Sequence, residues 1–141
     1  MNQPMKKLAP PVMILACSGA ANVGQMANRV AVELTREGFG QMFCVAALGA
    51  HLPKFVNYAQ KVPSMVAIDG CSIGCIRSIL EHVEVPLRSY VVLTELGFEK
   101  NMNSNLEQAD IEKVKQAVRS GITGSTLFPT RNPSDGGCCG T

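Results

Sequence analysis

The sequence predicts an α/β fold: an open, mostly parallel sheet of at least four strands with helices on both faces, in three layers. Four short apolar runs support this prediction, because each has the composition of a strand buried on both sides. These runs cover residues 12–17, 41–46, 64–68 and 90–93. Helical patterns separate the runs, and right-handed crossovers between parallel strands place such helices on both faces of a sheet.

The clearest helical pattern covers residues 23–37, where one face is apolar, the other is charged, and Gly38 ends the pattern. Asn22 precedes it and is a favourable cap residue. Residues 48–60 are ambiguous, and a loop followed by a short helix that begins at Pro53 is one interpretation. Two more helices are predicted over residues 73–82 and 106–119. This alternation of strands and helices is typical of a Rossmann-like sheet.

The length of 141 residues suits one domain with a real core. We expect residues 1–11 to be a polar lead-in and residues 12–120 to form a single α/β domain. Residues 121–141 are rich in Gly, Ser and Pro and end in Cys138-Cys139-Gly-Thr, which predicts a flexible tail.

The charge and composition of the chain argue against two classes of partner, nucleic acid and membrane. The net charge is +2, the chain has no Trp, and no basic stripe alternates with aromatic residues, so nucleic acid is not an expected partner. No apolar stretch approaches the ~20 residues of a membrane-spanning helix, and Pro10-Pro11 interrupt the N-terminal run that resembles a secretion signal. We therefore expect a soluble, cytoplasmic protein with reduced thiols and no membrane partner. The protein partner is not identified by the sequence, and a homodimer is one assembly that it allows.

Cysteines lie at or just beyond the ends of three predicted strands, at Cys17, Cys44 and Cys71, and Cys75 follows in the same turn. The carboxyl ends of parallel strands meet at one edge of a sheet, where ligands bind. We therefore expect these four side chains to converge.

Four converging thiols indicate a soft-metal site or a redox site, and the metal site is favoured. The N-terminus of the predicted helix 73–82 favours thiolate at Cys71 and Cys75, and thiolate is the form that binds zinc. A tetrahedral site needs two more donors, which Cys17 and Cys44 supply. Zinc is the preferred cofactor, and an iron–sulfur cluster is the alternative because four thiolates serve both.

The tripeptide Asp69-Gly70-Cys71, together with the other three cysteines in this order, resembles the DGC-domain family of small bacterial and archaeal proteins. That family is named for the tripeptide and for four cysteines that are potential zinc chelators. The similarity extends from Val12 to Val118 and includes Asn-Val-Gly-Gln at residues 22–25 and Gly-Ala-His at residues 49–51. The resemblance implies no established reaction, and it implies metal ligands at Cys17, Cys44, Cys71 and Cys75.

Other residues near these cysteines have supporting roles in this interpretation. His51 is an alternative ligand in place of Cys17 or Cys44, although a position in the second shell is favoured. Asp69 is expected to accept hydrogen bonds from the turn that follows it, and Gly70 and Gly74 permit that turn. His82 near a helix end is most simply a partner of the helix dipole.

Two alternatives remain open. Residues 71–78 fit Cys-x5-Arg-Ser, the phosphate loop of tyrosine phosphatases and arsenate reductases, with Cys71 as nucleophile and Arg77 as phosphate clamp. No aspartate lies in a convincing position for the acid that such enzymes need. A thiol redox module is the other alternative, although Cys71 and Cys75 have three residues between them and not two. A closed four-thiolate site has no open position for water, which favours a structural, metal-handling or sensing role over catalysis.

Overall fold

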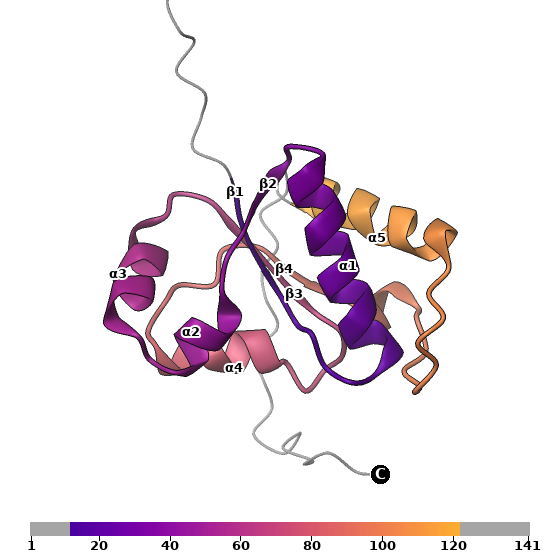
Figure 1. Ribbon diagram of the computed structural model, residues 1–141, viewed down its shortest axis with the longest axis horizontal. Coiled ribbons are helices and arrows are strands. Elements are labelled where there is room, and N and C mark those ends of the chain that lie inside the picture. Colours follow the sequence, from indigo (N-terminus) through magenta and orange to yellow (C-terminus); the bar gives the residue numbers. More distant parts are fainter. Residues whose placement is uncertain (1–11, 122–141) are drawn as a thin grey trace, which may run out of the picture.

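The computed structural model describes residues 12–121. The predicted lead-in over 1–11 and the predicted tail with Cys138 and Cys139 lie outside the described residues. Four strands form one parallel sheet in the order β2-β1-β3-β4, as Figure 1 shows at the centre of the molecule. Their bounds are β1 (Val12–Ala16), β2 (Gly40–Met42), β3 (Met65–Asp69) and β4 (Tyr90–Val92). The predicted open α/β sheet with flanking helices is confirmed.

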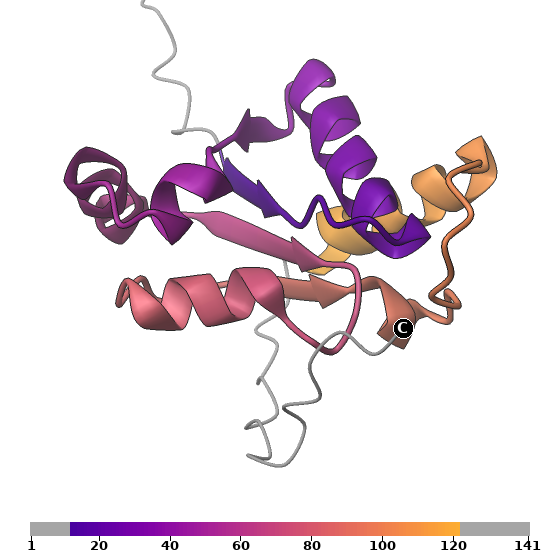
Figure 2. The ribbon, with the colours of Figure 1, turned by 60° about the horizontal axis from the view of Figure 1, so that its bottom comes forward.

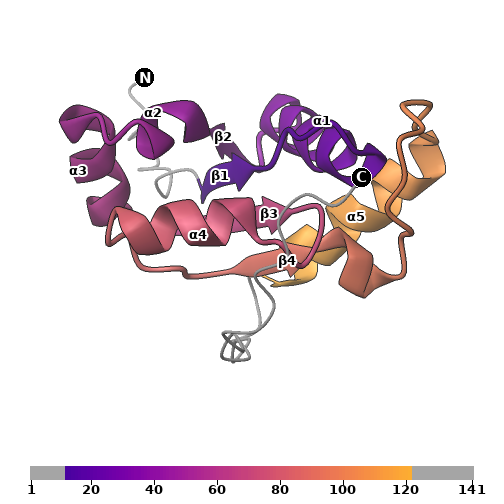
Figure 3. The same cartoon turned by 90° about the horizontal axis from the view of Figure 1, so that it is seen from below.

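The helices divide between the two faces of the sheet, as Figures 2 and 3 show. One face is covered by α1 (Asn22–Arg36) and α5 (Gln108–Gly121). The other face is covered by α2 (Val45–Gly49), α3 (Pro53–Lys61) and α4 (Cys75–His82). A short 3₁₀ helix, η1 (Leu93–Leu96), follows β4.

Alternating side chains of the two central strands build a separate core on each face. Ile14 and Ile68 pack with the buried residues of α1 and α5, whereas Leu15 and Ala67 pack with those of α3 and α4. Because helices cover both faces of the sheet, the strand residues that point to either face are apolar. This explains the unbroken apolar runs in the sequence.

The predicted strand over 41–46 is wrong in its second half. The strand ends at Met42, and the apolar residues that follow form α2, with Ala47 and Leu48 buried. β2 is an edge strand that pairs with β1 alone. The chain therefore leaves the sheet after three residues and buries its next apolar residues as a helix. A continuous apolar run does not distinguish these two conformations.

The two ends of α1 can be compared with the helix stop and the helix cap predicted from the sequence. Gly38 has a φ of 77°, and the amide of Phe39 donates to Leu34, so the predicted glycine stop is confirmed. The expected cap at Asn22 is wrong, since Asn22 is the first residue of α1 and its side chain bonds elsewhere. Its Nδ2 donates to the Glu99 carbonyl at 2.8 Å and its Oδ1 accepts from the Asn101 amide at 2.7 Å. This side chain ties the start of α1 to the loop after η1.

Candidate functional site

All four predicted cysteines lie at the carboxyl edge of the sheet. Cys17 directly follows β1, and its amide donates to the Ile68 carbonyl at 2.9 Å. Cys44 lies two residues beyond β2 and precedes α2, while Cys71 lies two residues beyond β3. Cys75 is the first residue of α4. The parallel strands therefore bring cysteines from three separate segments to one edge, as expected.

The four cysteines differ in their surroundings. Cys17 and Cys71 are partly buried and pack against the core, whereas Cys44 and Cys75 are exposed, and none of the four is in a disulfide. Within residues 12–121, no three side chains of the Cys, His, Asp and Glu types lie close enough together to hold a metal ion. The structure thus collects the thiols on one edge but does not close them into a ready-made four-thiolate cage.

Asp69 is a buried residue just before the turn that carries Cys71 and leads to Cys75 at the start of α4. It is the last residue of β3, and only 1 % of its surface is exposed. Its carboxylate accepts hydrogen bonds from the Ile76 amide at 3.0 Å, the Arg77 amide at 3.2 Å and the Tyr90 hydroxyl at 2.7 Å. Asp69 therefore accepts hydrogen bonds from the first turn of α4, just beyond the turn in which they were expected, and these bonds fix the start of α4 where Cys75 lies.

The residue that precedes α4 cannot cap the helix itself. Gly74 has a φ of 68° and no side chain, so the free amides of the first turn need an acceptor from elsewhere. Asp69 provides it from the neighbouring strand. Burial, reinforced by the negative charge of Asp69, raises the pKa of Tyr90 well above its usual range. Tyr90 therefore stays protonated and donates its hydrogen bond.

Glycine backbones pack directly on one another beneath the cysteines. A Cβ on Gly70 would lie 2.8 Å from the Gly24 nitrogen, and a Cβ on Gly24 would lie 2.7 Å from the Gly19 nitrogen. The turn after β3 therefore lies against the start of α1, which in turn lies against the turn after β1. The need for Gly70 is this close approach and not a positive φ, which we had not expected from the sequence.

One basic side chain near the cysteines was missed by the sequence analysis. The Nζ of Lys100 lies 3.5 Å from the Sγ of Cys71, on the loop that Asn22 ties to α1. A cation at this distance complements a sulfur that carries negative charge as a metal ligand. No sequence signal indicates this contact, because the two residues are far apart in the chain and meet only through the fold.

His51 lies elsewhere than expected from the sequence. Its ring contacts the ring of His82, with the two centroids 6.4 Å apart. His82 ends α4, whereas Cys75 begins it. The structure therefore brings the two histidines together at the other end of this helix.

In the Cys-x5-Arg segment, the arginine and two backbone amides already have partners within the protein. Arg77 forms an ion pair with Glu81, with 3.6 Å between Nε and Oε1. Two of the amides that a phosphate loop would offer to its ligand, those of Ile76 and Arg77, are already bound by Asp69. These contacts favour a structural role for the turn over phosphate binding.

The fold and this edge together define a class of small α/β protein with a cysteine-bearing carboxyl edge and an Asp-Gly-Cys turn after a central strand. Residues 13–118 match the DGC domain, and the chain belongs to this family. The anaerobic and virulence modulator AnvM of Pseudomonas aeruginosa is 33% identical over 105 residues, which cover 74% of this chain and 80% of that protein. No solved structure matches the chain. The family resemblance predicted from the sequence is confirmed.

Proposed function

We propose that this protein binds a thiophilic metal ion, zinc in preference to an iron–sulfur cluster, through Cys17, Cys44, Cys71 and Cys75. The observation that supports the proposal is the placement of four cysteines from three separate segments on one edge of a parallel sheet. Ligand clusters at this edge are typical of binding sites in α/β folds. Packing alone does not require cysteine at the two exposed positions, Cys44 and Cys75.

The mixed burial of the thiols indicates how such a site would assemble. Cys17 and Cys71 pack against the core, and Asp69 and the glycine contacts hold the turns that carry them. Cys44 and Cys75 are exposed. Binding would therefore draw the exposed thiols toward the two held in place, and metal would be coupled to the positions of α2 and α4.

This coupling suits a sensing or metal-handling role. A site that closes only around its metal changes the surface of the protein when the metal leaves or when the thiols are oxidised. A relative named as an anaerobic and virulence modulator is consistent with such a role. Four thiolates on Zn²⁺ leave no open position for water, so the proposed role is not hydrolytic.

The decisive experiment is metal analysis of the full-length protein, purified reduced and without oxygen. We expect close to one equivalent of zinc, while visible absorption would indicate the iron–sulfur alternative. Cys75→Ser should lose most of the metal, and the double variant Cys138→Ser, Cys139→Ser is the matched control that should retain it. Less than about half an equivalent of any transition metal in the parent protein would contradict the proposal.

The phosphatase alternative makes the opposite prediction. Metal-free protein should then hydrolyse an aryl phosphate, and Cys71→Ser or Arg77→Ala should abolish turnover. We expect no such hydrolysis, because Asp69 already binds the Ile76 and Arg77 amides. Turnover that persists without metal and depends on Arg77 would overturn the metal proposal.

A further inference from the structure

The chain contains two histidines, and the fold places both on the wall of one cavity. This cavity of about 270 Å³ is lined by Gly49, His51, Ser78, Ile79 and His82. Both histidine side chains are exposed to solvent, so an ion can reach them. Their ring centroids are 6.4 Å apart and the rings meet at 75°.

The two histidines lie near the carboxyl ends of two neighbouring helices. α2 and α4 contact each other on the same face of the sheet. His51 follows the end of α2, and His82 is the last residue of α4. Cys75 begins α4, about two helical turns or 10 Å away along the axis. The histidine pair is therefore separate from the thiol edge.

His51 stands where a helix usually ends in glycine. Its amide donates to Leu48 and the amide of Leu52 donates to Ala47, which is the hydrogen-bond pattern of a Schellman turn. The residue at this point takes a left-handed conformation, and His51 has a φ of 56°. Histidine tolerates this conformation better than most residues, yet glycine has no Cβ to strain it. Helix termination alone does not account for an imidazole here.

We propose that His51 and His82 form a binding site for a divalent transition-metal ion such as Zn²⁺ or Ni²⁺, distinct from the thiolates. Imidazole is the nitrogen ligand that these ions prefer. With a metal–nitrogen bond of about 2.1 Å, the centroids of two rings on one ion lie about 5–6 Å apart. The observed 6.4 Å is close to that range. We expect rotation of the two exposed side chains to bring one nitrogen of each onto a shared ion.

The site would hold its ion with two protein ligands and leave the other positions open. Within residues 12–121, no third Cys, His, Asp or Glu side chain joins the pair to complete a cluster. Water would occupy the remaining positions, inside a cavity that Ser78 also lines. Such a site binds reversibly and exchanges its ion, unlike a closed four-thiolate centre.

The test uses the full-length protein without a polyhistidine tag, at about pH 7.5, where zinc is titrated while imidazole ¹⁵N resonances are followed. With two histidines in the chain, each resonance belongs to one of two known residues. We expect both rings to respond together, with a single dissociation constant. The same response should persist in Cys44→Ser, Cys75→Ser, which distinguishes this site from the thiolate site.

The matched variant is His51→Gly, which removes the imidazole but suits the left-handed turn. We expect its melting temperature to be unchanged or higher, while the zinc affinity reported by His82 falls at least about tenfold. His82→Gln should likewise lower the zinc affinity reported by His51 at least about tenfold. The proposal is overturned if only one ring responds, if neither responds up to about 1 mM zinc, or if His82 responds equally in His51→Gly.

Discussion

At the scale of single residues, Asp69 links the core to the candidate site. Its carboxylate accepts two amides of α4 and the hydroxyl of Tyr90, all within a buried environment. Hydrogen bonds to a charged group are stronger than those to a neutral one, and a buried carboxylate depends on them. The Asp of the Asp-Gly-Cys tripeptide thus holds the start of α4 in place.

Asp69→Asn tests this role. The amide side chain presents one oxygen and one NH₂ group, so it cannot accept from both α4 amides and Tyr90 as the carboxylate does. We expect a loss of about 2–3 kcal/mol in the free energy of unfolding, measured by urea denaturation. Tyr90→Phe removes one of the three hydrogen bonds and should cost about 1 kcal/mol. Equal losses in the two variants would show that the α4 amides do not depend on Asp69.

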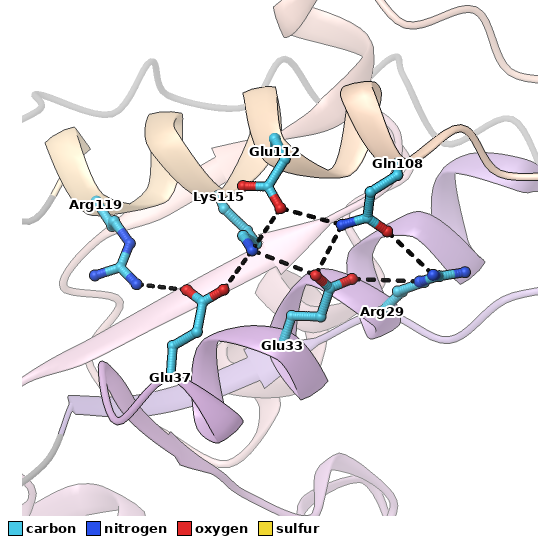
Figure 4. A network of polar contacts seen from close by, with 7 residues as sticks. All are labelled: Arg29, Glu33, Glu37, Gln108, Glu112, Lys115 and Arg119. Atoms are coloured by element: carbon cyan, nitrogen blue, oxygen red, sulfur yellow. Dashed lines mark hydrogen bonds and ion pairs between the residues drawn. The ribbon is translucent and has the colours of Figure 1, made fainter.

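At the scale of elements, α1 and α5 are joined by a network of charges over one face of the sheet. Figure 4 shows Lys115 of α5 between three carboxylates, those of Glu33, Glu37 and Glu112. Gln108 joins Glu33 to Glu112. Arg119 pairs with Glu37 at 2.6 Å, and Arg29 pairs with Glu33 at 3.3 Å. The lysine side chain is 5% exposed, so its stem packs between the helices while its charge is paired.

These contacts shift the acid–base behaviour of the network. Partial burial acts to raise the pKa of Glu33, but hydrogen bonds from Gln108, Lys115 and Arg29 outweigh it and lower the pKa below its usual range. Hydrogen bonds from Lys115 and Arg119 lower the pKa of Glu37. Since both pKa values are lower in the folded state, their stabilisation is present above the unfolded value of about 4.3 and is lost as pH falls through the folded values.

Lys115→Met tests the network. Removal of the shared cation leaves Glu33 and Glu37 with weaker partners, so we expect lower stability at neutral pH and a smaller further loss on acidification. Melting temperatures between about pH 7 and pH 3 measure both effects. Lys113→Met is the control, because Lys113 is exposed and its single pair with Asp110 contributes at most about 0.5 kcal/mol. A parallel acid dependence in wild type and Lys115→Met would refute the role of the network.

At the scale of the whole molecule, the carboxyl edge depends on how closely three turns pack. The backbone contacts of Gly19, Gly24 and Gly70 bring the turn after β1, the start of α1 and the turn after β3 together. Cys17 and Cys71 lie on two of these turns, and Asn22 and Lys100 join the loop after η1 to the same place.

Among the helices of residues 12–121, none is long and apolar enough to cross a membrane.

Gly70→Ala tests this packing. Its new Cβ would meet backbone atoms at 2.8 Å, so the turn after β3 must move away from α1. We expect a loss of about 1–3 kcal/mol in stability and a lower metal content than wild type. Gly49→Ala is the control, because its Cβ meets only the tip of Ile79 at 3.7 Å within a helix and should stabilise by up to about 1 kcal/mol. Equal stability of the two variants would contradict the close approach.

The sequence by itself determined the fold class and the candidate edge. Apolar runs buried on both faces can only be strands or buried helices, and their alternation with amphipathic segments leaves a parallel sheet as the simplest arrangement. Parallel strands then place Cys17, Cys44 and Cys71 on one edge, whatever the details of packing. The glycine stop of α1 also followed from sequence, because a left-handed helix end favours Gly38.

Only the tertiary structure decided where β2 ends and which residues distant in the sequence come into contact. Residues 43–46 leave the sheet although β1 extends two residues beyond its last pair with β2, so their apolar character alone does not decide between strand and helix. The contacts of Lys100 with Cys71 and of His51 with His82 join residues about 30 positions apart, and no local pattern encodes them. Local propensity and periodicity act over one helical turn or one strand, whereas these contacts arise from the packing of whole elements against a common sheet.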